Sequence, residues 1–413
     1  MRRVLFFVPT LSYGGAEKVV SLVSKKISGS DITIALLENK VSYPFRGTLC
    51  DLEIGYLKRH HFLGKIVKFF IALYKVRRFK RENRFDVSIS FIPICNILNV
   101  LTNGIEDVIL TVHVNEEMDQ PSNFYGWIYI ALMKLCYKRA NKIIAVSKSL
   151  RNQIVKDYGL DENHTKVIYD PLDSQELRQL SKKPLSEKFR QIFDSPVLIN
   201  IGRLSFQKGH THLIRTFRRI QNKHSFVKLI VLGEGHLLSE LTSLARSLNL
   251  RVYAYNDINA FGTNYDIYFL GFKKNPYPYL KASQLFLFPS LYEGFGMVII
   301  ESMLCGTPVI AADCDFGPRE ILSPMSSVNL HNYKPETTEY GVLMPSFNQF
   351  NKGNNKVSNN KLEKMWADTV LSLLMKSNDK NELFPKASQR AEEFDINNLI
   401  VEWESLINGQ NEK

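Results

Sequence analysis

The stretch from Leu285 to Ala312 constrains the fold more than any other part of the chain. It begins with a short apolar run that ends at Pro289, which is typical of a buried strand. After a glycine-containing loop, an apolar and glycine-free run from Met297 to Cys305 predicts a helix that Gly306 ends. Residues 307–312 predict a second strand. Strand, loop, helix and strand in this order predict a βαβ unit of a parallel sheet.

The loop of this unit carries groups suited to a phosphorylated and hydroxylated ligand. Glycines let the backbone approach a ligand without a Cβ in the way. Amides at the start of the helix can point N–H groups at an anion or a sugar oxygen, and ionised glutamates accept hydrogen bonds from diols. The candidate donor-binding residues are Glu293, Gly294, Phe295, Gly296, Met297, Val298 and Glu301. A glycine turn with two solvated glutamates is the alternative.

The spacing of the two glutamates resembles a known signature. Seven residues separate Glu293 from Glu301, with Gly-Phe-Gly after the first and Cys-Gly-Thr-Pro-Val-Ile after the second. This resembles the paired-glutamate signature of the retaining GT-B glycosyltransferases. The nearest group is the glycogen-synthase-like family that builds bacterial lipopolysaccharide, capsule and glycolipid sugars. The resemblance extends over about residues 3–320. It implies an α/β fold of two Rossmann-like domains facing across a cleft.

Length and composition agree with two domains. The chain has 413 residues, of which 45% are hydrophobic and 23% charged, so it is too long for one core and ordinary for a folded protein. We expect an N-terminal acceptor-binding domain over 1–172, a linker over 173–195 and a C-terminal nucleotide-sugar-binding domain over 196–393. By resemblance, a helix in 394–413 returns to the first domain. Residues 251–265 exceed the family's length and are predicted as a surface insertion.

Two motifs of the first half fit the resemblance. A predicted N-terminal strand leads to Gly14-Gly15-Ala-Glu-Lys, which is not the full dinucleotide fingerprint. In the family this loop closes over the donor diphosphate, and Gly15 is the residue concerned. Taken alone, His113 at the end of a predicted strand would be structural. The family places a histidine here beside the transferred sugar, where a neutral imidazole can bond a hydroxyl. Asp170-Pro departs from the family's usual Asn-Pro or Asn-Gly.

A basic motif opens the second half. Arg203 and Lys208, each beside a glycine, suit a pyrophosphate, because arginine offers a fork of donors and lysine a point charge. A basic surface loop is the alternative. The resemblance assigns this pair to the donor diphosphate and backbone atoms near Phe272 to the base. It assigns Glu301 to the ribose hydroxyls and Glu293 to hydroxyls of the transferred sugar.

These assignments imply a hexosyltransferase that moves a hexose or N-acetylhexosamine from a nucleotide-diphosphate sugar, with UDP favoured. The acceptor would be a lipid-linked saccharide or a polysaccharide of lipopolysaccharide, O-antigen or capsule synthesis. No motif supplies a carboxylate nucleophile, so front-face attack with retention is the hypothesis. It requires neither a metal nor a cofactor. Asp313-Cys-Asp315 spells D-x-D, but it follows a second-domain strand, so a metal site is not expected there.

Other functions remain open at this stage. A GDP-mannose-dependent mannosyltransferase is the first alternative. A nucleotide-sugar epimerase on the same fold would lack the glutamate pair, and a phosphorylase would carry a pyridoxal cofactor and a far longer chain. Nucleic-acid binding is not expected, because no recognised module is present.

Charge and apolar patterning predict a membrane partner. The chain carries a net charge of +12, and residues 1–172, with 25 Lys+Arg against 16 Asp+Glu, hold +9 of it. The apolar side chains of 62–74 cover one wide helical face, with Lys65, Lys68 and Lys75 on the other side. A helix that merely covers the sheet is the alternative. No run is long enough to span a bilayer, and the five cysteines lack metal spacing. We expect a cytoplasmic enzyme, peripheral on the inner face of the bacterial cytoplasmic membrane and bound to its anionic surface.

Overall fold

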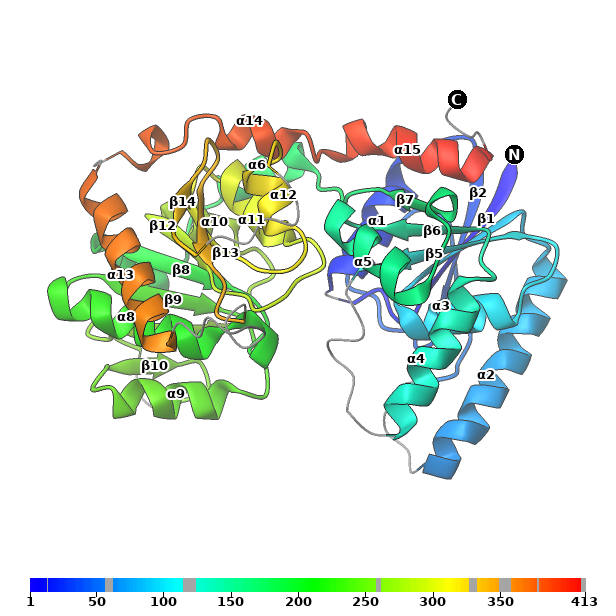
Figure 1. The fold of residues 1–413 in the computed structure, drawn as a ribbon, viewed down its shortest axis with the longest axis horizontal. Helices are drawn as coiled ribbons and strands as arrows, with labels where there is room; N and C mark the ends of the chain where they lie inside the picture. Colours follow the sequence, from blue (N-terminus) through cyan, green and yellow to red (C-terminus); the bar gives the residue numbers. More distant parts are fainter. Residues whose placement is uncertain are drawn as a thin grey trace. The chain divides into compact units, whose positions relative to one another are not determined.

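The computed structural model describes residues 1–12, 14–55, 62–113, 124–257, 261–326, 333–348, 358–376 and 379–409. The chain divides into two compact units (Figure 1). The first contains Met1–Asp173 and Phe394–Lys413, and the second contains Ser174–Glu393. The segment predicted as a linker therefore belongs largely to the second unit, where it forms the helices α6 (Ser174–Ser181), α7 (Glu187–Arg190) and η4 (Gln191–Asp194).

The first unit is built on a seven-stranded parallel sheet in the order β3-β2-β1-β4-β5-β6-β7. Both of its faces are covered, so the central strands are continuous apolar runs rather than alternating ones. The strands are β1 (Arg2–Val8), β2 (Ser30–Leu36), β3 (Thr48–Asp51), β4 (Val87–Phe91), β5 (Asp107–Val112), β6 (Lys142–Ala145) and β7 (Thr165–Val167).

Helices cover the two faces of this sheet with separate apolar clusters. One cluster joins α1 (Gly15–Lys26) and α15 (Ile396–Asn408) to β1, β2 and β4. The other joins α2 (Phe62–Asn83) and α3 (Pro93–Leu101) to the opposite face. The last helix of the chain thus packs in the first unit through Ile396, Trp403 and Ile407. The remaining elements are α4 (Phe124–Tyr137), α5 (Lys148–Tyr158) and η3 (Glu162–His164).

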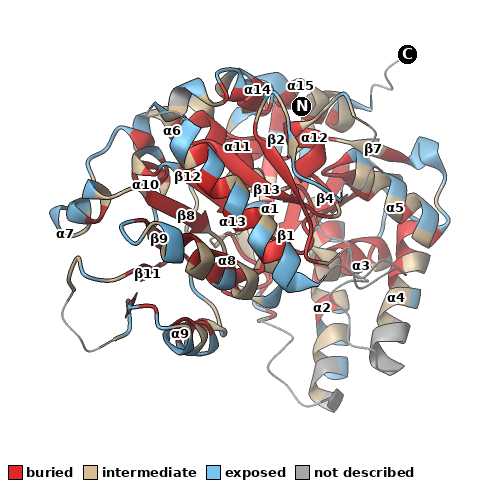
Figure 2. Ribbon diagram, turned by 60° about the vertical axis from the view of Figure 1, so that its left-hand side comes forward, coloured by how far each residue is buried: buried red, intermediate tan, exposed pale blue. Residues whose placement is uncertain are grey.

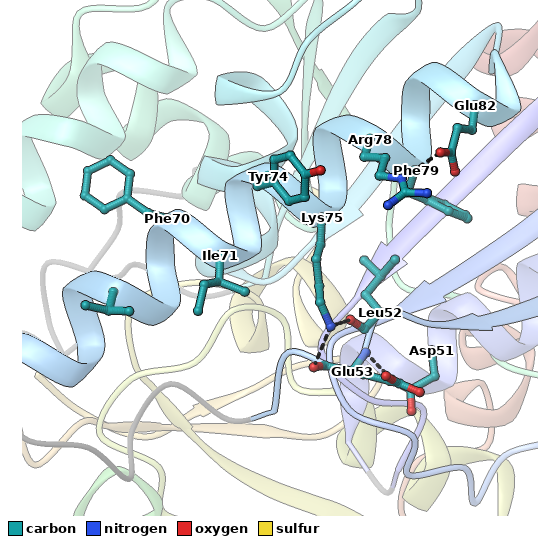
Figure 3. Close-up of a pocket in the computed structure, with 11 residues that line it drawn as sticks. Asp51, Leu52, Glu53, Phe70, Ile71, Tyr74, Lys75, Arg78, Phe79 and Glu82 are labelled. Atoms are coloured by element: carbon teal, nitrogen blue, oxygen red, sulfur yellow. Dashed lines mark hydrogen bonds and ion pairs between the residues drawn. The ribbon is translucent and has the colours of Figure 1, made fainter.

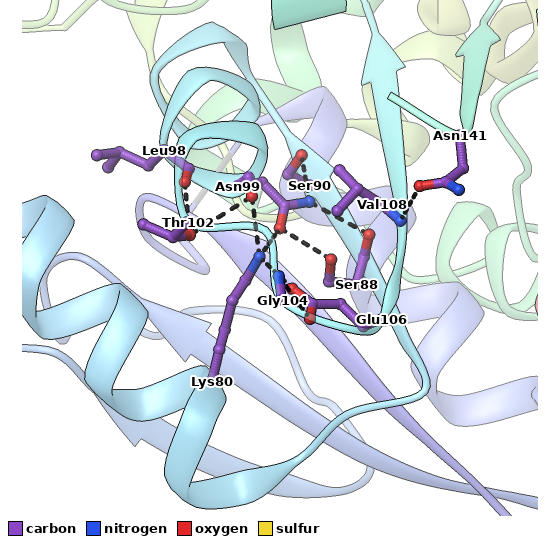
Figure 4. A network of polar contacts seen from close by, with 10 residues as sticks. All are labelled: Lys80, Ser88, Ser90, Leu98, Asn99, Thr102, Gly104, Glu106, Val108 and Asn141. Atoms are coloured by element: carbon purple, nitrogen blue, oxygen red, sulfur yellow. Dashed lines mark hydrogen bonds and ion pairs between the residues drawn. The ribbon is translucent and has the colours of Figure 1, made fainter. Parts of the chain in front are cut away.

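A buried polar network fixes the C-terminal end of α2 (Figure 4). The Lys80 ammonium lies 2.8 Å from Glu106 Oε1 and donates to the backbone and side-chain oxygens of Asn99 on α3. Asn99 in turn bonds the hydroxyls of Ser88 and Ser90 on β4. Burial lowers the pKa of Lys80, and the Glu106 carboxylate opposes that shift. The buried ammonium of Lys80, neutralised by Glu106, therefore joins α2 to the sheet and to α3.

The second unit has an eight-stranded sheet in the order β10-β11-β9-β8-β12-β13-β15-β14. All neighbours are parallel except β14 and β15. In both sheets the strands are mostly buried, and exposed residues lie on the outer helices (Figure 2). The strands are β8 (Val197–Ile201), β9 (Lys228–Leu232), β10 (Val252–Ala254), β11 (Ile267–Gly271), β12 (Leu285–Phe288), β13 (Val309–Asp313), β14 (Glu336–Thr337) and β15 (Val342–Pro345).

The helices of the second unit follow these strands in a βα alternation. They are η5 (Phe206–Lys208), α8 (His210–Lys223), α9 (Leu238–Ser247), α10 (Tyr277–Ala282), α11 (Met297–Leu304), α12 (Pro318–Leu322), α13 (Asn359–Lys376), η7 (Lys380–Glu382) and α14 (Ala387–Glu392). The prediction of a surface insertion over 251–265 is wrong for β10, whose three residues are buried and pair with β11. Among the helices of the described ranges, none combines the length and the apolar composition needed to cross a bilayer.

Candidate functional site

The predicted βαβ unit is present in the second sheet as β12, α11 and β13. Gly296 caps the start of α11 with φ 99°, a left-handed conformation that favours glycine. The backbone N–H of Glu293 donates to the carbonyl of Asp315 at 3.2 Å, which fixes the loop against the segment after β13. The loop therefore lies at the carboxyl ends of β12 and β13, where parallel sheets bind their ligands.

Lys208 and Glu293, predicted separately, form an ion pair. The Lys208 ammonium lies 2.5 Å from Glu293 Oε1, and the two side chains are 20% and 8% exposed. The lysine stem runs past Gly202, where an added Cβ would lie 3.3 Å from Lys208 Cγ. Its ammonium also lies 5.7 Å from the centre of the Phe288 ring. A cation and a carboxylate are thus held together at the ends of the adjacent strands β8 and β12.

Arg203 lies in the loop after β8 and is exposed. The loop itself is rigidly joined to the loop after β9, because the backbone N–H of Leu204 donates to the carbonyl of Glu234 at 2.9 Å. A Cβ at Gly233 would lie 2.0 Å from the carbonyl oxygen of Gly202, so only glycine fits that contact. The planar fork of the Arg203 guanidinium can donate two hydrogen bonds to a diphosphate.

Glu301 lies on the second turn of α11 and is buried. The hydroxyl of Tyr277 donates to Glu301 Oε1 at 3.3 Å. Tyr277 begins α10 and is itself buried. Sequence reasoning missed this tyrosine, because the contact joins residues 24 apart and no local pattern marks it. It holds one carboxylate oxygen of Glu301 in place.

The turn after β11 carries Phe272, which is exposed. Its backbone N–H donates to Glu234 Oε1 at 3.2 Å. The preceding Gly271 has φ 72°, and a Cβ there would lie 3.0 Å from the ring of Tyr255. Tyr255, from the segment predicted as an insertion, therefore packs directly on this turn. The partly exposed rings of Tyr255 and Phe272 and the carboxylate of Glu234 thus lie together at this turn.

Gly15 and His113 belong to the first unit. Gly15 is the first residue of α1, and a Cβ added to it would meet no atom within 4 Å. His113 directly follows β5. Its ring lies between Thr111 and Asp170 and stacks on Phe91 with ring centres 5.9 Å apart. Both residues lie after strands of a parallel sheet, at its carboxyl edge.

The aspartates of the D-x-D sequence have protein partners. Arg319 Nε donates to Asp313 Oδ1 at 3.0 Å, and its second nitrogen bonds Oδ2. The carbonyl of Asp315 accepts from Glu293 N. Within the ranges that the structure describes, no three or more His, Cys, Asp or Glu side chains are grouped to hold a metal ion. Asp313 is thus part of a buried ion pair that supports α12.

Comparison with known proteins agrees with this geometry. Residues 13–176 match the family described as Glycosyltransferase Family 4, and residues 181–333 match Glycosyl transferases group 1. An uncharacterized glycosyltransferase of Methanocaldococcus jannaschii is 34% identical over 355 residues, which are 84% of each chain. The N-acetylgalactosamine-N,N'-diacetylbacillosaminyl-diphospho-undecaprenol 4-alpha-N-acetylgalactosaminyltransferase of Campylobacter jejuni is 28% identical over 78% of this chain and 83% of its own.

Solved structures share the fold. HepE of Anabaena in complex with UDP and glucose has a TM-score of 0.72 at 18% identity, covering 99% of this chain and 100% of that one. WaaG, a glycosyltransferase involved in lipopolysaccharide biosynthesis, has a TM-score of 0.68 at 14% identity, covering 98% and 100%. Two parallel α/β units, the matched families and the archaeal relative together show that the chain belongs to the glycosyltransferases of the GT-B fold.

Proposed function

We propose that the chain transfers a hexosyl or N-acetylhexosaminyl group from a UDP-sugar to a lipid-linked or polysaccharide acceptor, with retention of the anomeric configuration. The Lys208–Glu293 pair carries the proposal, because it places a cation for a diphosphate beside an acceptor for sugar hydroxyls. The solved HepE complexes contain UDP or UDP-glucose. The name of the Campylobacter relative specifies a diphospho-undecaprenol acceptor.

In this proposal the chain stabilises the leaving group rather than supplying a nucleophile. Arg203 and Lys208 offset the charge that grows on the diphosphate as the glycosidic bond breaks. Glu301, held by Tyr277, binds the ribose hydroxyls. Glu293 binds hydroxyls of the transferred sugar, and the acceptor attacks the same face that the diphosphate leaves. The two cations provide the charge stabilisation, so the proposed step needs no metal ion.

The diphosphate of the nucleotide sugar competes with Glu293 for the Lys208 ammonium. Before binding, the Lys208 ammonium is neutralised by Glu293 at 2.5 Å. An incoming diphosphate must share that ammonium, and Glu293 then has a free oxygen for a sugar hydroxyl. The Lys208 ammonium thus couples binding of the diphosphate to binding of the sugar.

A donor screen tests the proposal. The protein is incubated with UDP-glucose, UDP-galactose, both UDP-N-acetylhexosamines and GDP-mannose, with a polyprenyl-diphosphate saccharide as acceptor. We expect UDP release with one UDP-sugar and an axial product linkage by NMR. Release from GDP-mannose alone would support the mannosyltransferase alternative. Inversion of the linkage, or no release from any donor by folded protein, would contradict the proposal.

We also propose that α2 docks the enzyme on an anionic membrane surface. Val67, Phe70, Ile71 and Tyr74 are 58%, 63%, 45% and 66% exposed. Figure 3 shows Phe70, Ile71 and Tyr74 on successive turns of the helix. The sequence assigned Phe69 and Leu73 to the same lipid-facing side, but the structure packs both against the core. Lys75 is also engaged, since its ammonium donates to the carbonyls of Leu52 and Glu53.

Three further basic residues of α2, Lys68, Arg77 and Arg81, favour an anionic surface as the partner. The groove beside the apolar side chains does not add to this charge, because its carboxylates outnumber its basic groups. It is lined by Asp51, Leu52, Glu53, Val67, Phe70, Ile71, Tyr74, Lys75, Arg78, Phe79 and Glu82. Each basic residue near an anionic lipid surface contributes about 1 kcal/mol, so three suffice for reversible binding.

Vesicle sedimentation tests the membrane proposal. The wild type should sediment with phosphatidylglycerol vesicles at low salt and detach at high salt. The double variant Phe70→Ser with Tyr74→Ser should lose binding. Val401→Ser is the matched control, because Val401 is 63% exposed in the same unit but lies on α15, which packs on the opposite face of the sheet from α2. Equal binding by the double variant and the control would show that α2 only covers the sheet.

A further inference from the structure

The loop that carries Glu293 lies against segment 313–319, which joins β13 to α12. The backbone N–H of Glu293 donates to the carbonyl of Asp315 at 3.2 Å. Gly317 packs on the carbonyl of Phe295, because a Cβ added to the glycine would lie 1.8 Å from that oxygen. The backbone of segment 313–319 therefore determines where the loop of Glu293 lies.

Segment 313–319 does not adopt its backbone conformation by local preference. Phe316 has φ 68° and Gly317 has φ 95°. The left-handed region is unfavourable for a bulky side chain such as that of Phe316, which is also buried. Residues in such conformations persist only where the surrounding structure fixes them. The segment therefore depends on contacts outside its own backbone.

Arg319 supplies these contacts and joins the two ends of the segment. Its Nε donates to Asp313 Oδ1 at 3.0 Å, and its Nη2 donates to Oδ2, so the last residue binds the first in a bidentate pair. Its Nη1 donates to Glu336 Oε2 on β14 at 3.1 Å and to the hydroxyl of Ser326 at 3.2 Å. The Arg319 and Asp313 side chains are only 5% and 3% exposed. A planar guanidinium holds several acceptors at fixed angles, which a lysine ammonium does not.

We propose that Arg319 is a positioning residue for the transferred sugar, because by fixing segment 313–319 it fixes the loop that presents Glu293. This inference rests on the proposed function, in which Glu293 binds hydroxyls of that sugar. Arg319 acts through the backbone contacts of Asp315 and Gly317 rather than by touching the donor.

The two halves of the donor should respond differently to the loss of Arg319. The ribose is assigned to Glu301, whose carboxylate is held by Tyr277 of α10. Without Arg319 the loop of Glu293 should shift, and the transferred sugar should lose its acceptor. Transfer is then impaired, while binding of UDP, which lacks that sugar, persists.

Two substitutions disturb the contact from opposite sides. Arg319→Met removes the guanidinium, whereas Gly317→Ala leaves the ion pair intact and places a methyl group against the carbonyl of Phe295. Arg319→Lys keeps the charge and tests for partial rescue. Arg251→Met is the matched control, because Arg251 also forms a bidentate pair with a buried aspartate of the same unit, Asp266.

Backbone hydrogen exchange over residues 289–297 is measured by mass spectrometry without any donor. The Glu293 amide should be protected in the wild type and in Arg251→Met. It should exchange roughly tenfold faster or more in Arg319→Met and Gly317→Ala, because the local structure opens more often. Arg319→Lys should lie between these variants and the wild type.

Kinetics and UDP titration on the same preparations complete the test. In Arg319→Met and Gly317→Ala, kcat should fall by roughly tenfold to a hundredfold, since a misplacement of about 1 Å can cause such a loss. UDP affinity should remain as in Arg251→Met. A loss of UDP affinity as large as the loss of kcat would overturn the assignment.

Unchanged exchange in the folded variants, or an equal effect of Arg251→Met, would show that Arg319 only stabilises the unit. Gly317→Ala decides the question if Arg319→Met does not fold. Because exchange is measured without donor, faster exchange in the variants together with an inactive wild type would count against the proposed function alone.

Discussion

At the scale of single residues, the ion pair of Lys208 and Glu293 determines how the candidate site can be probed. Glu293 is buried, and the Lys208 ammonium lies 2.5 Å from its Oε1. Removing the lysine leaves a buried carboxylate without its counter-ion, which is costly in itself. Arg203, by contrast, is exposed. The two cations assigned to the diphosphate should therefore differ in their effect on folding.

Alanine substitutions separate these effects. Arg203→Ala and Lys208→Ala should each lower turnover on the order of a hundredfold, because each removes charge stabilisation from the transition state. Only Lys208→Ala should also lower the melting temperature. Kinetics and thermal unfolding on the same preparations provide the comparison. Turnover near wild type in both variants would rule out the diphosphate assignment.

Buried His210 makes a second residue-scale prediction. Burial, reinforced by the nearby Lys208 charge, lowers the pKa of His210 from 6.5 to about 4. The unfolded chain takes up a proton below pH 6.5 and the folded one does not, so stability is lost as the pH falls from 6.5 towards 4. The full shift corresponds to about 3 kcal/mol.

His210→Leu should reduce this acid sensitivity. Neither ring nitrogen of His210 has an aligned hydrogen-bond partner in the described part of the chain, so leucine forfeits little at neutral pH. Denaturant unfolding at pH 7.5 and pH 5 measures the change. The difference between the two pH values should shrink in the variant, and an unchanged difference would refute the prediction.

The sequence pointed to the candidate site residues that belong to a local motif. Lys208 was recognisable from the basic motif with its flanking glycines, and Glu293 and Glu301 from the seven residues between them. The contacts of Tyr277 with Glu301 and of Asp170 with His113 were not predicted. In each pair the fold brings together residues from different βα segments. Side-chain contacts of that kind have no signature in a single sequence.

At the scale of elements, the C-terminal part of α2 is bonded to the protein interior, whereas its earlier turns carry exposed apolar side chains. Lys80 joins its C-terminal part to α3 and Glu106 inside the protein. Earlier along the helix, Phe70 and Tyr74 are among the most exposed large apolar residues of the described chain. The buried network thus keeps the exposed apolar side chains presented in one orientation.

Breaking this network should destabilise the first unit. Lys80→Ala leaves the Glu106 carboxylate buried and unpaired, at a cost of about 3–5 kcal/mol. The pair Lys80→Met with Glu106→Gln removes both charges and should recover most of that loss. Arg78→Ala, which breaks the exposed pair with Glu82 on the same helix, is the control and should cause no measurable change. Comparable unfolding curves for Lys80→Ala and the control would contradict this role.

Most central elements were predictable, and the missed ones are short. The strands β4, β5, β9 and β12 are apolar runs that a buried parallel sheet requires. β3 and β10 were not predicted, because β3 is an edge strand of at most partly buried residues and β10 lies in the stretch interpreted as an insertion. The stretch 173–195, predicted as a linker, forms the short helices α6, α7 and η4, whose partly buried faces its polar composition does not reveal.

At the scale of the whole molecule, each unit has its own parallel sheet and its own share of the assigned residues. The second unit holds every residue assigned to the nucleotide except Gly15, and the first holds Gly15, His113 and the helix α2. Substitutions in the second unit should therefore have the main effect on nucleotide affinity. This division is the central claim, and it can be tested without knowing the sugar or the acceptor.

Calorimetric titration of UDP into the wild type and three variants tests that claim most directly. Glu301→Ala should weaken binding by roughly tenfold or more, through lost bonds between a charged acceptor and the ribose, and Tyr277→Phe should weaken it less. Glu293→Ala should leave UDP affinity unchanged or higher, because Lys208 is released to the diphosphate. Equal losses in Glu301→Ala and Glu293→Ala, or no binding of UDP or GDP by the folded wild type, would contradict the account.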